Sequence, residues 1–282
     1  MPPPVADAGP DHLPPLRETI ARHGLGARKS LGQHFLLDLN LTRRIVRAAA
    51  PLAGVTVIEI GPGPGGLTRA LLESDAAAVV AIERDDRCIA ALEELRSVAG
   101  GRLSLIAGDA LEADCEALAP APRAIVANLP YNIATPLLIG WLKRIKAYRS
   151  LTLMFQKEVA DRLTARPGNK TYGRLSVMAQ WRAVVRPVLT IPARAFTPPP
   201  KVDSAVVSLV PRDDPEPAEW AAMERIGAAA FGQRRKMLRQ SLKSLGDAEG
   251  LLTETGLPPT ARAEEVDVAG FAALARALAA RG

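Results

Sequence analysis

The residues Asn128, Leu129, Pro130 and Tyr131 form a short motif that follows an apolar, strand-like run. Asn128 offers a side-chain oxygen, and Pro130 restricts Leu129 to an extended geometry in which its carbonyl is presented from a stiff loop. Both oxygens can accept hydrogens from an amine on a flat ring, whose lone pair is otherwise delocalised. The Tyr131 ring can stack on a base taken out of its helix. The motif predicts catalysis by alignment and electrostatic placement, without a metal or a covalent nucleophile; the alternative is a proline turn with a core tyrosine.

A glycine-rich loop directly follows another predicted strand and opens a helix. Gly61, Gly63 and Gly66 have the spacing G-x-G-x-x-G, which on its own indicates a dinucleotide site. Pro62 and Pro64 have no amide hydrogen, so a loop meant to grip a pyrophosphate would lack two potential donors. A nucleoside without phosphate, such as S-adenosylmethionine, needs no such cradle. The loop therefore favours that cofactor over a dinucleotide, with an ordinary tight turn as the alternative.

Acidic residues end or follow the next two predicted strands. Glu83 ends one strand and can accept hydrogen bonds from both hydroxyls of a ribose. Asp109 follows the next strand and can accept from the exocyclic amine of an adenine. Either acid alone could be a helix cap. Together with the glycines they mark three consecutive strand ends at the sheet edge where ligands bind.

The elements that must position these groups alternate between short apolar runs and helical stretches. Near-continuous apolar strands between helices are typical of a parallel sheet that is covered on both faces. The pattern predicts an α/β fold with a doubly wound, Rossmann-like sheet. The predicted strands are 55–60, 79–82, 103–107, 124–127 and 151–155, with two further strand-like runs around 177–185 and 206–210, and the predicted helices are 39–50, 66–74, 86–98 and 134–147.

Three segments are predicted along the chain. Residues 1–16 are rich in proline and are expected to form a flexible tail, and residues 17–210 form the cofactor-binding domain. Residues 211–217 interrupt the pattern with prolines and acids and are interpreted as a linker. The remainder, within 211–282, is expected to form a small helical domain with helices 219–231, 236–245 and 268–280.

Composition excludes several classes of protein. With 282 residues, 48% hydrophobic and 23% charged, the chain can bury a sizeable core, so a disordered or fibrous protein is excluded. Cys88 and Cys115 have neither metal nor disulfide spacing, which fits a reducing cytosol. The three histidines all lie in the first 34 residues, so no metal site is expected. Without a signal sequence or a membrane-spanning run, and with no oligomer seam visible, we expect a cytoplasmic monomer.

Charge is distributed unevenly along the chain. The net charge is +6, yet residues 51–126 carry −6 and residues 143–201 carry +11, and residues 231–245 contain five bases and no acid. A solvated helical face with scattered loops would account for some of this. The asymmetry favours a face built for phosphates, and hence a nucleic-acid partner.

Several long segments in this order resemble the ribosomal RNA adenine N6-dimethyltransferase family, over about residues 26–245. The resemblance implies transfer of methyl groups from S-adenosylmethionine to N6 of two adjacent adenines in a 3′-terminal hairpin of 16S ribosomal RNA, during maturation of the small subunit. The segment 196–204 resembles the small-subunit branch of the family more closely than its large-subunit branch. The segments that carry the resemblance are 29–36, the Gly61 loop, Glu83, Asp109, 128–131, 155–158, 197–204, Phe231 and 234–238.

The resemblance also implies roles for single residues. His34 and Leu36 are expected at the methionine end of the cofactor; many relatives have Asn where this chain has His34, and either side chain can hydrogen-bond. The resemblance further assigns the loop glycines Gly61 and Gly63 to the cofactor, Glu83 to its ribose, Asp109 to its adenine, and Asn128 to both cofactor and target. The residues expected to contact RNA are Lys201 after the proline-rich stretch, and Arg234, Arg235, Lys236 and Arg239 on a basic helix.

Three other functions are kept open. The first is a large-subunit rRNA adenine methylase that confers antibiotic resistance. The second is a non-catalytic ribosome-assembly factor on the same fold, against which the intact loop, acids and 128–131 motif count. The third is a nicotinamide oxidoreductase, which Pro62, Pro64 and the same motif disfavour.

Overall fold

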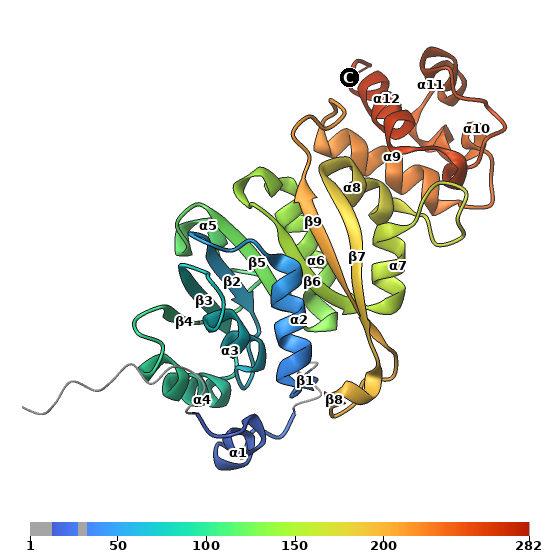
Figure 1. Cartoon of the computed structure of the whole chain (residues 1–282). Helices are drawn as coiled ribbons and strands as arrows, with labels where there is room; N and C mark the ends of the chain where they lie inside the picture. The colour runs from blue at the N-terminus through green and yellow to red at the C-terminus, as the bar shows by residue number, and fades with distance from the viewer. Residues whose placement is uncertain (1–12, 28–32, 282) are drawn as a thin grey trace, which may run out of the picture. The chain divides into compact units, whose positions relative to one another are not determined.

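A computed structural model describes residues 13–27 and 33–281 (Figure 1). A seven-stranded sheet has the order β4-β3-β2-β5-β6-β9-β7, in which β2 to β6 run parallel and β9 runs antiparallel to β6. Helices cover both faces, which confirms the predicted Rossmann-like α/β fold. The strands are β2 (Thr56–Ile60), β3 (Ala78–Glu83), β4 (Leu103–Ala107), β5 (Arg123–Asn128), β6 (Leu151–Gln156), β7 (Ala183–Ile191) and β9 (Ser204–Pro211).

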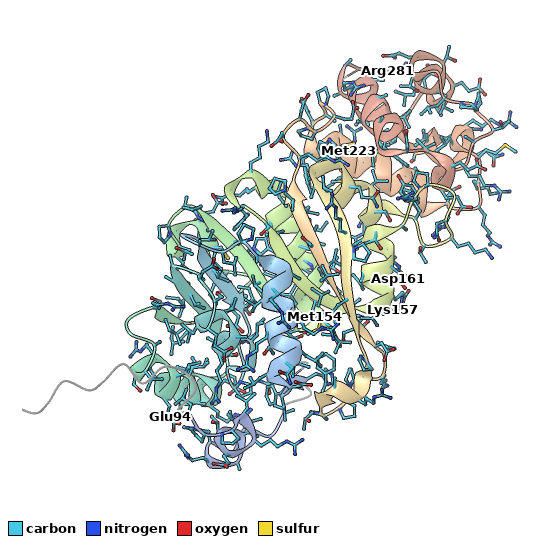
Figure 2. The ribbon with its side chains drawn as sticks, viewed as in Figure 1. Glu94, Met154, Lys157, Asp161, Met223 and Arg281 are labelled. Atoms are coloured by element: carbon cyan, nitrogen blue, oxygen red, sulfur yellow. The ribbon has the colours of Figure 1, made fainter. Side chains whose placement is uncertain are left out.

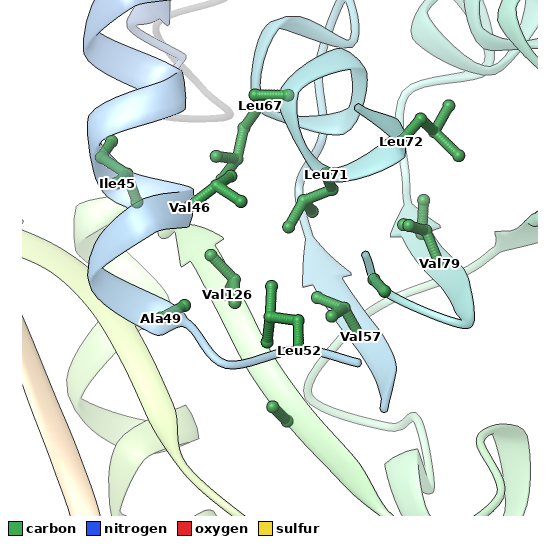
Figure 3. Close-up of a cluster of buried hydrophobic side chains, with 14 of the residues drawn as sticks. Ile45, Val46, Ala49, Leu52, Val57, Leu67, Leu71, Leu72, Val79 and Val126 are labelled. Carbon is green, nitrogen blue, oxygen red and sulfur yellow. The ribbon is translucent and has the colours of Figure 1, made fainter. Parts of the chain in front are cut away.

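Three helices, α2 (Leu39–Ala49), α3 (Gly66–Leu72) and α4 (Asp86–Ser97), pack into one apolar cluster with the sheet. Asp38 caps α2 by accepting from the Asn40 amide, after which apolar residues recur at helical spacing along one face. Side chains of α2, α3, β2, β3 and β5 meet in this cluster (Figure 3). The cluster fixes the turn between β2 and α3, which carries the glycine loop.

The segment that carries the 128–131 motif ends β5 and starts the next helix. Pro130 is the N-cap of α6 (Tyr131–Lys143), so the helix begins three residues earlier than expected. Proline suits this position because its fixed φ is compatible with a helix start and its missing N–H has no helical partner there. A second, two-stranded antiparallel sheet pairs β1 (Phe35–Leu36) with β8 (Phe196–Thr197).

The chain forms two compact units, and the division differs from the predicted one. Of the described residues, the first unit contains 13–27, 33–157 and 187–209, and the second contains 158–186 and 210–281. Residues 158–186 thus group with the C-terminal helices instead of the cofactor domain, because Ala165, Tyr172 and the buried face of α8 (Arg174–Arg182) belong to the core of the second unit. The predicted tail, 1–16, falls almost entirely outside the described residues, and a helix, α1, begins at Leu16.

Two element predictions in the second half of the chain are wrong. The run 177–185 is not a strand: Val177, Met178 and Trp181 lie on one face of α8, and the strand β7 begins only at Ala183. Residues 236–245 do not form one helix: the short helix α10 (Leu238–Ser241) is followed by a 3-10 segment (Leu242–Leu245).

The core of the second unit is separate from that of the first. Met223 of α9 (Trp220–Gly232), which is labelled in Figure 2, belongs to this core. Tyr172, Trp181 and Phe271 belong to the same cluster. Within the described residues, every helix is too short or too polar to cross a lipid bilayer. The remaining helices are α1 (Leu16–Arg22), α5 (Cys115–Leu118), α7 (Lys157–Thr164), α8 (Arg174–Arg182), α9 (Trp220–Gly232), α10 (Leu238–Ser241), α11 (Ala248–Thr255) and α12 (Val268–Ala279).

Candidate active site

One pocket lies at the carboxyl ends of β2, β3, β4 and β5, within the first unit. Parallel strands bring their ends to one edge, so residues distant in sequence meet there. The pocket collects every residue predicted to bind the cofactor or to act in catalysis, and their individual roles remain predictions. These lining residues are His34, Leu36, Gly61, Gly63, Glu83, Asp109, Asn128, Leu129, Pro130 and Tyr131.

The glycines of the loop meet two separate requirements. Gly61 and Gly63 have φ of 63° and 55°, in the left-handed region that other residues rarely adopt. Gly66 is needed for space: a Cβ there would lie 2.7 Å from the Leu36 carbonyl oxygen. The loop therefore packs against β1 with no room for a side chain at its helix end.

Glu83 is the acceptor for three backbone amides. Its Oε2 accepts from Gly63 N at 3.0 Å, and its Oε1 accepts from Arg84 N at 2.8 Å and Asp85 N at 2.9 Å. Burial raises the pKa of Glu83, and the three amide donors oppose that rise. The glycine loop thus directs an N–H at a carboxylate of the protein itself, which makes the site a poor cradle for a pyrophosphate.

Glu59, near the end of β2, lines the pocket, and no role was predicted for it from the sequence. Its side chain is buried, at 1% exposure, and Oε2 has no hydrogen-bond partner in the described part of the chain. Burial raises the pKa of Glu59 to about 8; the Thr68 hydroxyl opposes this rise, and the charge of Glu83 adds to it. A carboxyl group inside an otherwise apolar strand was the available signal, because such groups are rarely buried without a partner.

Asp109 follows β4 and also lines the pocket. Its Oδ1 accepts from Leu111 N at 2.9 Å, and its Oδ2 accepts from Arg84 Nη1 at 2.9 Å. The Arg84 side chain is 68% exposed, so this ion pair contributes little and a ligand amine can replace it.

Asn128 lies where β5 ends. Its Nδ2 donates to the His34 carbonyl oxygen at 3.3 Å, which leaves the side-chain oxygen available to accept from a ligand. Leu129 is buried, at 1% exposure, and holds the motif in the core. The Pro130 ring lies 3.5 Å from the position that a Cβ on Gly61 would occupy, so the motif and the glycine loop are in contact.

Tyr131 and His34 form a stacked ring pair at the pocket. Their ring centroids are 5.7 Å apart with an interplanar angle of 30°. The Tyr131 hydroxyl lies 2.6 Å from Ser204 Oγ, and burial raises its pKa. His34 Nδ1 lies 2.8 Å from the Pro198 carbonyl oxygen, and since a carbonyl can only accept, Nδ1 carries the proton.

The predicted RNA-contacting residues lie in both units. Lys201 is exposed in the first unit, and Arg235, Lys236 and Arg239 are exposed in the second. Arg234 is different: its Nε donates to Glu264 Oε2 at 2.9 Å and its Nη2 to the Asn169 carbonyl at 3.4 Å. The prediction of a basic helix for these residues is wrong, since residues 234–236 lie in a turn before α10.

The chain is similar to proteins that act on ribosomal RNA. The family model described as ribosomal RNA adenine dimethylase matches residues 24–280. A protein of Rhodospirillum rubrum named "Ribosomal RNA small subunit methyltransferase A" is 63% identical over 99% of this chain and 97% of its own length. A protein of the same name from Paramagnetospirillum magneticum is 64% identical over 95% of this chain and 96% of its own length.

Solved structures show the same fold. A dimethyladenosine transferase from Plasmodium falciparum has a TM-score of 0.76 and 26% identity, and the match covers 88% of this chain and 98% of that one. The 23S rRNA methyltransferase ErmE has a TM-score of 0.67 and 29% identity, over 87% of this chain and 99% of its own.

Proposed function

The chain belongs to the ribosomal RNA adenine dimethylase family, and from this membership we propose that it transfers methyl groups from S-adenosylmethionine to N6 of adenines in small-subunit ribosomal RNA. The identity of 63% to a protein named for the small subunit, over nearly the whole chain, is the observation that supports this target most directly. Identity to the 23S rRNA enzyme is 29%. The product is N6,N6-dimethyladenosine in two adjacent adenines of the 3′-terminal hairpin of 16S ribosomal RNA.

The pocket fits a cationic nucleoside cofactor. Glu59 and Glu83 put two buried carboxyl groups on its lining, and the only cationic side chain there, within the described residues, is the exposed Arg84. When bound, S-adenosylmethionine supplies a methyl group on a positively charged sulfur. In the proposed arrangement Glu83 holds the ribose hydroxyls, Asp109 holds the adenine amine, and the main chain around His34 and Leu36 faces the methionine end.

The unpaired Oε2 of Glu59 supports the fit between the pocket and a cationic cofactor. A buried carboxyl group with an unpaired acceptor atom is costly, and it gains a partner when a cationic group binds beside it. Glu59 can therefore accept from the ammonium group of the methionine moiety.

The acceptor side of the pocket is formed by the 128–131 motif. The Asn128 side-chain oxygen and the Leu129 carbonyl accept the two hydrogens of the target amine, which directs its lone pair toward the methyl group. Tyr131 stacks on the base that has been taken out of its helix. These residues bind and orient the amine, and no metal ligand or covalent nucleophile is assigned to the step.

The RNA itself is held by cationic side chains. Lys201 is exposed directly after the proline-rich stretch 198–200 of the first unit. Arg235, Lys236 and Arg239 are exposed on the second unit, where they can contact phosphates. Arg234 has a structural part as well, because it pairs with Glu264. The proposed partner is the immature small ribosomal subunit, bound by a monomer of this protein in the cytoplasm.

The test uses small ribosomal subunits from cells that lack the modification. They are incubated with the protein and S-adenosylmethionine labelled in its methyl group, and the RNA is digested and analysed for methylated adenines. We expect label in N6,N6-dimethyladenine at two adjacent positions, and about 100-fold slower transfer by Asn128→Ala. Asn40→Ala, which alters an exposed asparagine outside the pocket, is the matched control.

Other outcomes of this assay separate the alternatives. Label only in large subunits would favour the antibiotic-resistance type of methylase. Absence of transfer to any RNA, with an active relative as positive control, would leave a non-catalytic assembly factor as the better description and would refute the proposed function.

A further inference from the structure

A single segment of the first unit, Thr197–Ser204, anchors both rings of the pair at the pocket. Its first part supplies the Pro198 carbonyl, which accepts from His34 Nδ1 at 2.8 Å. Its last residue supplies the Ser204 hydroxyl, which lies 2.6 Å from the Tyr131 hydroxyl. Ser204 is fully buried, so its own position is fixed by the sheet, where it begins β9. The segment therefore holds one ring at each of its two ends.

The two anchors and the stack restrict the Tyr131 ring in different directions. The hydrogen bond to Ser204 fixes the hydroxyl end of the ring, and the His34 ring, stacked at 5.7 Å, fixes the tilt of its face. A tyrosine held at only one of these points can still turn about its side-chain bonds. The plane of Tyr131 is defined only when both contacts are made.

These contacts of His34 are with the acceptor side of the pocket. Its ring N–H donates to the Pro198 carbonyl, its ring stacks on Tyr131, and its main-chain carbonyl accepts from Asn128 Nδ2 at 3.3 Å. All of these partners belong to the acceptor motif or to the 197–204 segment. The resemblance to known enzymes implies instead that the residue at this place contacts the methionine end of the cofactor.

We propose that His34 is a positioning residue for the acceptor base: with Ser204 it holds the plane of Tyr131 on which the target adenine stacks. This inference rests on the proposed function, because it assumes that an adenine amine is the methyl acceptor. The amine must lie in line with the methyl group, and a shift of about 1 Å in such alignments can lower a rate by about 100-fold. A base that stacks on a tilted ring presents its amine away from that line.

A second methyl transfer depends on the same alignment. In the first transfer the amine nitrogen forms a bond to the methyl carbon while the bond from that carbon to the donor sulfur breaks, and one amine proton is released to water. The amine then carries a methyl group and only one hydrogen, so only one of the two acceptors of the 128–131 motif still holds it. The stacking surface then contributes a larger share of the positioning. Loss of the His34 contact is therefore expected to slow the second transfer more than the first.

The experiment compares His34→Ala, His34→Phe and Ser204→Ala with the unaltered protein on unmodified small ribosomal subunits. Three quantities are measured for each: the dissociation constant of S-adenosylmethionine, the maximal rate of methyl transfer, and the ratio of N6-methyladenine to N6,N6-dimethyladenine in the RNA. His23→Ala and Ser208→Ala are the matched controls, since His23 pairs with Glu94 outside the pocket and Ser208 lies further along β9.

For His34→Ala we expect a maximal rate lower by about tenfold or more, a cofactor dissociation constant within about twofold of normal, and a raised share of the monomethyl product. His34→Phe keeps a ring on Tyr131 and should recover part of the rate, whereas Ser204→Ala should lower the rate and raise the monomethyl share as His34→Ala does. Circular dichroism and thermal unfolding identify any variant that fails to fold. If His34→Ala fails to fold, His34→Phe is compared with the unaltered protein instead.

Two results would overturn the inference. A His34→Ala protein whose cofactor affinity falls while its rate at saturating cofactor is normal would assign the side chain to the cofactor. A His34→Ala protein that matches the unaltered protein in all three quantities would show that the stack has no part in positioning. Failure of the unaltered protein to methylate any adenine would instead refute the proposed function, so the two failures are distinguishable.

Discussion

Replacement of Glu59 by glutamine should make the ligand-free protein more resistant to unfolding as the pH rises. Glu59 is buried, and its pKa is raised from 4.5 to about 8, mainly by that burial. Between these two values the folded protein retains a proton that the unfolded chain has lost. The favourable contribution of the protonated group is complete below about pH 4.5 and is lost as the pH rises toward 8.

The size of the effect follows from the same two pKa values. Their difference corresponds to about 5 kcal/mol in the free energy of unfolding at pH 8 and above. The part of this loss that accumulates between pH 5.5 and pH 7 is about 2 kcal/mol. Glutamine has nearly the shape of the protonated side chain but does not titrate, so Glu59→Gln lacks this pH dependence.

The measurement is urea unfolding of both proteins at pH 5.5 and pH 7, without cofactor. The two units can unfold separately, so hydrogen exchange of the β2 amides is used to follow the first unit. Groups that are not coupled to Glu59 titrate equally in both proteins, so the difference between the two pH dependences reports Glu59 together with its coupling to Glu83. Equal pH dependence in the two proteins would show that Glu59 has an ordinary pKa and that its unpaired oxygen is solvated in solution. Glu59→Gln should also bind S-adenosylmethionine more weakly, since a glutamine cannot ionise when the ammonium group binds beside it.

Two further predictions concern the loop and the RNA. Gly66→Ala should destabilise the first unit by about 1–3 kcal/mol and weaken cofactor binding, because its Cβ would lie 2.7 Å from the Leu36 carbonyl oxygen; thermal unfolding tests this against Gly140→Ala on α6, where a Cβ meets nothing within 4 Å and the change should be neutral or stabilising. Replacing Arg235, Lys236 and Arg239 together by alanine should weaken RNA binding and reduce the slope of log K against log salt by about 2 to 3, measured by salt titration. Arg22→Ala, which removes a cation paired with Glu94, should leave that slope unchanged, and an unchanged slope in the triple variant would assign the phosphate contacts elsewhere.

The parallel part of the fold could be predicted because its signals are local. Each strand from β2 to β6 contains a short apolar run, helical spacing separates most of these runs, and each run alone decides its own conformation. The convergence of Gly61, Glu83, Asp109 and Asn128 then followed from the rule that parallel strands end at one edge. No contact had to be known in advance for that prediction.

The errors lie where a distant partner decides the conformation. The run 177–185 contains β-branched residues that favour a strand, but Trp181 and Val177 are buried against α9 and α12 of the second unit, and this packing selects a helix. The same packing draws residues 158–186 into the second unit. Arg234 could not be separated from its exposed neighbours, because its partner Glu264 is thirty residues away in sequence.

The glycine loop shows why spacing alone does not identify a ligand. The G-x-G-x-x-G spacing specifies a tight turn with close backbone approach, and in dinucleotide sites the free amides of that turn face a pyrophosphate. Here Pro62 and Pro64 remove two amides, and the Gly63 amide donates to the Glu83 carboxylate. The turn thus holds a carboxylate side chain in the place of an anionic ligand, and the unpaired Glu59, whose pKa is raised by burial, can ionise when a cationic ligand binds. A site arranged in this way attracts positive charge and repels phosphate, so the ligand class is decided by the group opposite the glycines.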